Sequence, residues 1–102
     1  MATQSLRCEH RHVTDRYHVR FVSPGGWVYE MWPSGRDARE AVRKADALLE
    51  YVERVGISDY LDDDGVTARP PAQLTVAIVS DPTESESALR CTRPDGSLAR
   101  ER

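Results

Sequence analysis

Two runs of the chain, Tyr17-His18-Val19-Arg20-Phe21-Val22 and Trp27-Val28-Tyr29-Glu30-Met31-Trp32, decide the fold. Both alternate with a period of two and are rich in β-branched and aromatic residues, which is typical of strands with one buried face. Ser23-Pro24-Gly25-Gly26 separates them, and these residues favour a three-residue loop that closes through a left-handed Gly26. The sequence therefore predicts an antiparallel hairpin.

The loop also predicts how the two strands pair. When Ser23 lies opposite Trp27, the other pairs of the hairpin are fixed. They are Val19 with Met31, Arg20 with Glu30, Phe21 with Tyr29, and Val22 with Val28. A slip of one residue would mix the two faces of the hairpin, so we expect this register and no other.

A long amphipathic helix is predicted directly after the hairpin. Ser34 is the expected N-cap, and Asp37 three residues later completes a variant of the capping box. Apolar residues then recur in steps of three and four, at Ala38, Ala41, Val42, Ala45, Leu48, Leu49, Val52 and Val55. Gly56 is expected to end the helix as the residue after its C-cap.

The remaining segments are predicted to complete one domain over residues 1–102. Residues 1–16 are read as a polar lead-in or edge strand, 17–56 as the hairpin plus helix, 73–79 as a central strand, and 80–102 as a loop with a terminal hairpin. The expected fold class is α+β. It consists of a small antiparallel sheet of three to five strands packed on one long amphipathic helix, in β-β-α-β order.

Composition and charge narrow the classes of protein to which the chain can belong. The net charge of −3 argues against a general affinity for nucleic acid or anionic membranes. No apolar run approaches membrane-spanning length, and residues 1–5 lack the apolar core of a signal peptide, so we expect a cytoplasmic protein. Thirteen of the fourteen basic residues are Arg, which is typical of a high-GC bacterial or phage gene.

Metal-binding and catalytic motifs are not evident. Cys8, His10, His12 and Cys91 are metal-binding residue types, but they lack the C-x-x-C spacing of structural zinc sites. Reduced cysteines are expected, with a disulfide between the chain ends as the alternative. The sequence has no nucleophile elbow and no phosphate-binding glycine loop. We therefore expect no cofactor and a protein that is not an enzyme.

The second face of the hairpin is the first candidate partner-binding surface. It presents Val22, Val28 and Trp32 beside Arg20 and Glu30, and the centres of protein interfaces favour Trp and Arg. Such a face also suits a homodimer. The competing interpretation is that the N-terminal segment or the terminal hairpin folds over this face.

The acidic residues Asp62, Asp63 and Asp64 form a second candidate contact, suited to a basic partner. Asp62-x-Asp64-Gly65 resembles the middle of a calcium loop. However, Tyr60 and Pro71 occupy the first and twelfth positions of such a loop, where carboxylate ligands are needed. A solvated loop is therefore the preferred reading of this stretch.

Nucleic-acid binding is the alternative function. Four arginines lie near the aromatic strand residues in the sequence: Arg7, Arg11, Arg16 and Arg20. Arginines beside aromatic side chains can hold phosphates or stack on bases. The competing interpretation is that the aromatic residues form the core against the helix. These residues are Tyr17, Phe21, Trp27 and Tyr29.

A family resemblance points toward protein binding. The run Tyr17-x-Val19-x-Phe21, Gly26-Trp27-Val28, Pro33-Ser34-Gly35, and then Glu40-Ala41 with Ala45, resembles the strand-strand-helix pattern of HicB-like antitoxins. The resemblance covers Tyr17 to about Glu53. It implies a non-catalytic α+β module that binds and blocks a partner protein. The leading expectation is therefore an antitoxin-like or phage-encoded inhibitor.

Overall fold

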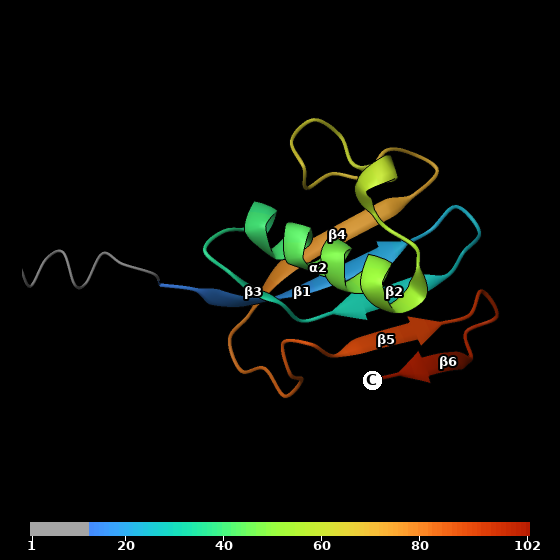
Figure 1. Cartoon of the computed structure of the whole chain (residues 1–102). Helices are drawn as coiled ribbons and strands as arrows, with labels where there is room; N and C mark the ends of the chain where they lie inside the picture. Colours follow the sequence, from blue (N-terminus) through green and yellow to red (C-terminus); the bar gives the residue numbers. More distant parts are fainter. Residues whose placement is uncertain (1–12) are drawn as a thin grey trace, which may run out of the picture.

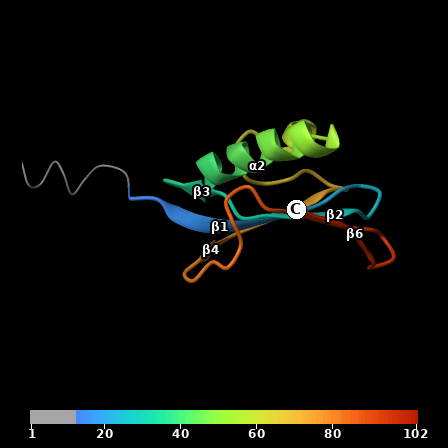
Figure 2. The same ribbon diagram turned by 60° about the horizontal axis from the view of Figure 1, so that its bottom comes forward.

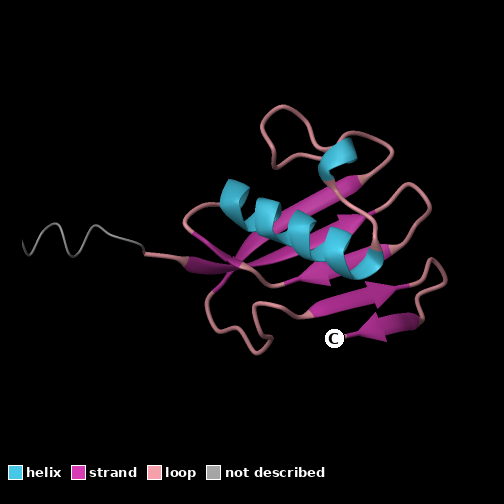
Figure 3. Ribbon diagram, viewed as in Figure 1, coloured by secondary structure: helices cyan, strands magenta, loops and turns pink. Residues whose placement is uncertain are grey.

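An antiparallel sheet carries one long helix on one of its faces in the computed structural model of the chain, which describes residues 13–102 (Figure 1). The elements are β1 (Asp15–Val22), β2 (Val28–Met31), β3 (Ser34–Gly35), α2 (Ala38–Glu53), η1 (Ser58–Tyr60), β4 (Gln73–Val79), β5 (Leu89–Thr92) and β6 (Leu98–Glu101). The predicted α+β class and element order are confirmed (Figure 3). The two-residue β3 brings the sheet to six strands. No helix within residues 13–102 is long and apolar enough to cross a membrane.

The hairpin has the predicted register. Val19 pairs with Met31, Phe21 with Tyr29, and the other two pairs also match. In the loop, Gly26 adopts the left-handed conformation with φ of 90°, and its N–H donates to the Ser23 carbonyl over 2.9 Å. Glycine has no Cβ to clash in this region, so the loop closes without strain.

The helix begins three residues later than the sequence predicts. Asp37 is the N-cap, and its carboxylate accepts a hydrogen bond from the Glu40 N–H over 2.8 Å. Glu40 in turn accepts from the Arg36 N–H over 2.7 Å. Ser34 is not available as a cap because β3 continues the extended chain and pairs with β1, where Arg16 lies opposite Ser34. The capping pair is therefore Asp37 with Glu40, although Glu40 reaches back to the N–H of Arg36 and not to that of the cap itself.

The helix also ends earlier than predicted. Its last residue is Glu53, and Arg54 takes the left-handed conformation with φ of 57° that was expected of Gly56. The Arg54 N–H donates to the Glu50 carbonyl over 3.0 Å. Val55 consequently lies beyond the helix and is 37% exposed, so it does not extend the buried stripe.

The strand predicted at residues 73–79 exists with those bounds, but it is not central. The strand order is β4-β1-β2-β5-β6, and within residues 13–102 β4 pairs with β1 alone. The apolar run indicated burial on both faces, yet the burial alternates. Leu74 and Val76 are half-buried below the helix layer, whereas Ile78 is 62% exposed. β4 is therefore an edge strand.

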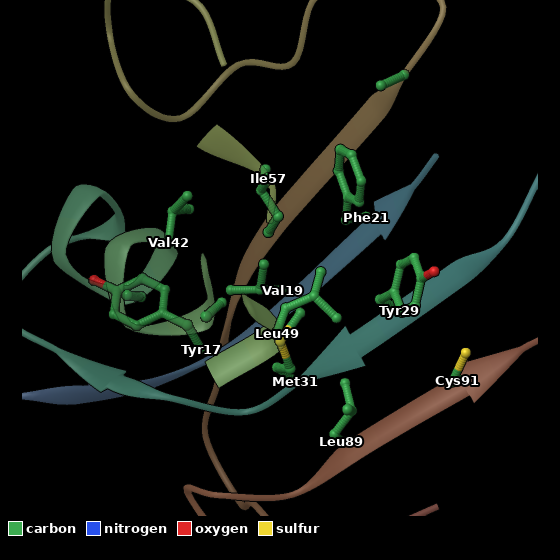
Figure 4. Packing of buried hydrophobic residues seen from close by; sticks show 13 residues of the cluster. Tyr17, Val19, Phe21, Tyr29, Met31, Val42, Leu49, Ile57, Leu89 and Cys91 are labelled. Carbon is green, nitrogen blue, oxygen red and sulfur yellow. The ribbon is translucent and has the colours of Figure 1, made fainter. Parts of the chain in front are cut away.

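The core lies between the sheet and α2 (Figure 4). The strands contribute Val19, Phe21, Met31 and Leu89, and the helix contributes Ala41, Val42, Ala45 and Leu49, all fully buried. Burying a large apolar side chain contributes roughly 1.5–3 kcal/mol, so this layer holds the fold together. Tyr17 and Tyr29 are also buried, as the core interpretation of the hairpin aromatics predicts, whereas Trp27 is 37% exposed.

Candidate interface on the open face of the sheet

The sheet has one face that α2 does not cover, which we call the open face (Figure 2). Side chains alternate along a strand, so residues directly opposite one another across the sheet share a face. The observed register places the following residues on the open face: Arg16, His18, Arg20, Val22, Val28, Glu30, Arg90, Thr92, Leu98 and Glu101. Eight of these ten residues, all except Arg16 and His18, form two parallel rows across the strands.

The charge row runs across four strands as Arg20, Glu30, Arg90 and Glu101, with alternating sign. Arg90 contacts Glu101 over 3.0 Å and Glu30 over 3.9 Å. The hydrogen bond to Glu101 raises the pKa of Arg90. Glu30 also contacts the His18 ring nitrogen over 3.0 Å. Arg20 takes part in none of the ion pairs found within residues 13–102, unlike the other three members of the row.

The apolar row lies next to the charge row and consists of Val22, Val28, Thr92 and Leu98. Val22, Val28 and Thr92 are half-buried, and Leu98 is 52% exposed. The register places Gln73 of β4 beyond Val22. Among residues 13–102 this apolar stripe has no cover, and an apolar stripe beside a line of charges resembles the centre and rim of a protein interface.

Trp32 does not provide the exposed aromatic expected of this face, because it is only 9% exposed. The His18 ring stacks on it with centroids 5.3 Å apart, and the Arg90 guanidinium lies 5.2 Å from its ring centre. Its carbonyl accepts a hydrogen bond from Arg16 Nε over 2.9 Å. Trp32 therefore holds this end of the face together and cannot present its ring to a partner.

The loop between β4 and β5 covers part of the open face near Trp32. Arg16 donates to the Glu84 carbonyl, and Arg90 contacts the Glu84 carboxylate over 3.6 Å. Ser34 donates to the Glu86 carboxylate. The competing interpretation was that the N-terminal segment or the terminal hairpin folds over this face. Residues 1–12 of the N-terminal segment lie outside the described residues, and the terminal hairpin does not fold over the face. Instead β5 pairs with β2 and extends the sheet, which leaves the apolar row uncovered by it.

The acidic loop lies on the helix side of the sheet and not with the open face (Figure 1). Asp64 accepts hydrogen bonds from the N–H groups of Val66 and Thr67 and from the Thr67 hydroxyl, and these bonds lower its pKa. Asp62 lies 3.9 Å from Arg69, and Asp63 is exposed. Two of the three carboxylates are thus engaged by their own loop. The acidic loop and the hairpin face cannot form one continuous site.

The residues of the nucleic-acid alternative do not form a basic surface with exposed aromatics. Arg7 and Arg11 lie outside the described residues, and Arg16 is bound to backbone carbonyls. Arg20 lies on the open face beside the carboxylates of the charge row. Tyr17, Phe21 and Tyr29 are each at most 7% exposed, so they cannot stack on bases.

The metal-ligand candidates are only partly placed. Cys8, His10 and His12 lie outside the described residues. Cys91 is a free, buried thiol whose pKa is raised by burial. No group of metal-ligating side chains occurs between residues 13 and 102.

A hollow of about 260 Å³ lies between α2 and the acidic loop. It is lined by Arg39, Arg43, Asp46, Ser58, Leu61 and Gly65. The Asp46 carboxylate accepts hydrogen bonds from the Ile57 and Ser58 N–H groups and so fixes η1 against the helix.

Sequence reasoning did not identify Arg90, Thr92, Leu98 and Glu101 as members of the candidate interface. The terminal hairpin was predicted, and the alternating burial of β5 puts Arg90 and Thr92 on one side. The missing information was the pairing of β5 with β2, which no local pattern reports. No family model, curated protein or solved structure matches the chain.

Proposed function

We propose that the chain is a non-enzymatic protein-binding module that contacts its partner through the apolar row and Arg20. The observation that carries this proposal is the row Val22-Val28-Thr92-Leu98, which no other element of residues 13–102 covers, directly beside a charge row whose other members are already paired. Burying half-exposed apolar side chains against a partner favours association. The paired charges hold the strands in place and do not need to be desolvated.

The surface also defines the chemistry of the partner. Arg20 lies opposite the uncharged Thr75 of β4 on one side and opposite Glu30 of β2 on the other. The Glu30 carboxylate is bound to His18. A carboxylate on the partner can form a bidentate pair with the Arg20 guanidinium. The partner is therefore a protein whose contact surface combines an apolar patch with an acidic side chain at its border.

An inhibitory role follows from the resemblance of residues 17–53 to HicB-like antitoxins. Such a module acts by covering a surface that its partner needs, and it requires no catalytic group of its own. β1 and β2 lie inside the resembling region and carry Arg20, Val22 and Val28, so part of the candidate interface falls within the resemblance. Thr92 and Leu98, on β5 and β6, lie outside it.

Nucleic-acid binding is the second candidate, and Arg20 on the open face favours it. Glu30 and Glu101 in the same row repel phosphates, so the geometry supports protein binding better. Fluorescence anisotropy with single-stranded RNA and DNA at several salt concentrations separates the two. Affinity that falls steeply with salt supports nucleic-acid binding, whereas no binding at low salt excludes it.

Site-specific photocrosslinking in the native host tests the protein-binding proposal. A benzophenone amino acid replaces Leu98 on the open face or Tyr51 on the outer side of α2; the native side chains are 52% and 81% exposed. We expect one protein to be captured from position 98 and not from position 51. It must then bind the purified wild-type chain. Equal capture from both positions, or from position 51 alone, would contradict the proposal.

A further inference from the structure

The outer edge of β4 presents free backbone hydrogen-bonding groups. The Tyr17 N–H of β1 donates to Pro33, on the β2 side, so the even-numbered residues of β1 point toward β4. Their partners in β4 are Gln73, Thr75, Ala77 and Val79. The N–H and C=O groups of Leu74, Val76 and Ile78 therefore point away from the sheet. No backbone hydrogen bond from residues 13–102 reaches them.

This edge lacks the features that usually prevent edge strands from pairing. Natural edge strands carry charged residues, prolines or bulges, or are very short. β4 is seven residues long, and none of them is charged or proline. The opposite edge of the sheet, β6, has four residues, of which Arg100 and Glu101 are charged. The β6 edge is therefore protected against pairing with another strand, whereas the β4 edge is free to pair.

We infer that β4 pairs with β4 of a second copy of the chain, antiparallel and around a two-fold axis at Val76. In this register Val76 meets Val76 of the second copy, and Leu74 meets Ile78. All three outward-pointing residues of each strand then exchange hydrogen bonds, which no other register of the strand allows. The contact is isologous, as a closed dimer requires.

The sequence around β4 is matched to pairing with itself. Pro70 and Pro82 lie at equal distances before and after Val76, so they meet at the two ends of the paired segment and limit its length. The helix-side row contains only Leu74, Val76 and Ile78, and no like charges face each other. Arg69 precedes the strand and Asp81 follows it, so antiparallel pairing brings the basic end of one copy toward the acidic end of the other. These features favour a second copy over an unrelated strand.

The dimer would contain one continuous sheet with both helices on the same side. Ile78, which is 62% exposed in the single chain, would pack beside Leu74 of the second copy. The two open faces would lie side by side and present two apolar rows. Dimerisation through β4 does not depend on the proposed partner, because the apolar row and the β4 edge are different surfaces.

Sedimentation analysis of the full chain across the micromolar range tests this inference. We expect the wild type to reach the mass of two chains and Val76→Lys to remain a single chain, because the introduced charges meet at the two-fold axis. Ile78→Lys is a second test in case Val76→Lys perturbs folding, because Ile78 is exposed in the single chain and its replacement should leave the fold intact. Ala47→Lys on the exposed side of α2 adds the same charge and should leave the dimer intact.

Amide hydrogen exchange identifies the edge and the register. In the wild type, the amides of Leu74, Val76 and Ile78 should exchange more slowly as protein concentration rises, whereas those in the β6 edge should not change. A wild type that stays a single chain would overturn the inference. So would a dimer that survives both lysine substitutions in β4, or one that is lost on Val28→Glu instead.

Discussion

His18 and Glu30 lie on neighbouring strands with 3.0 Å between their side-chain nitrogen and oxygen atoms, and the same imidazole stacks on Trp32. This relationship explains why the most prominent aromatic of the hairpin is not a contact residue. The charged groups near Trp32 bind one another and enclose the ring. What remains available on the open face is the apolar row with Arg20.

Trp32→Ala should therefore destabilise the fold, whereas Trp27→Ala should have little effect. Trp32 is 9% exposed and packs between His18 and Arg90, so we expect a loss of about 3 kcal/mol in the free energy of unfolding. Trp27 is 37% exposed in the hairpin loop region, and its removal should cost less than about 1 kcal/mol. Urea unfolding of both variants measures the difference. Similar losses of unfolding free energy in the two variants would show that Trp32 is not packed between His18 and Arg90.

Asp37→Ala should destabilise the chain more than Ser34→Ala. Asp37 caps the helix by accepting from the Glu40 N–H, and losing an N-cap typically costs about 1 kcal/mol. Ser34 lies in β3 and caps nothing, so its hydroxyl contributes only exposed contacts, donating to Glu86 and accepting from Lys44 over 3.4 Å. Thermal or urea unfolding distinguishes the two. A larger effect at Ser34 would support a helix that starts where the sequence alone predicted.

The stability of the chain should depend on Glu40 at acidic pH. Hydrogen bonding from the Arg36 N–H, aided by its side chain, lowers the pKa of Glu40 from 4.5 to about 2 in the folded protein. The unfolded state therefore binds this proton more readily, and the stabilising contribution present above pH 4.5 is lost as the pH falls toward 2. Glu40→Gln should lose less stability than the wild type over this interval.

Glu50→Gln provides the matched control for this pH dependence. It removes the same charge from an exposed position of α2 without touching the capping pair. Urea midpoints measured at several pH values should fall in parallel for the wild type and Glu50→Gln. If Glu40→Gln also follows the wild type, the capping hydrogen bonds do not hold the carboxylate ionised.

The parts of the fold that local sequence decides were predicted accurately. The loop at Gly26 fixes the register of the hairpin, and the helix pattern of α2 needs only its own periodicity. The errors occur where distant segments intervene. Ser34 was expected to cap the helix because its pairing with Arg16 of β1 is not visible in the local pattern. β4 was expected at the centre because an apolar run does not show whether a neighbouring strand covers its outer edge.

The candidate site was predicted in part for the same reason. Val22, Val28, Arg20 and Glu30 share one face as the alternation of the hairpin indicated. Trp32 left that surface because Arg90, far along the chain, lies over its ring and is itself paired with Glu84. Thr92 and Leu98 joined it because β5 adds to β2. Long-range strand pairing therefore determines which residues of the predicted face remain accessible.

The central claim is that the apolar row binds a partner protein. Calorimetric titration of the captured partner with Leu98→Glu and Val28→Glu tests it most directly, with Tyr51→Glu as the control on the opposite side of the molecule. Circular dichroism and urea unfolding establish that each variant is folded. The account predicts an affinity loss of roughly tenfold or more for both open-face variants and none for the control. Unchanged affinity in the two folded open-face variants would contradict it.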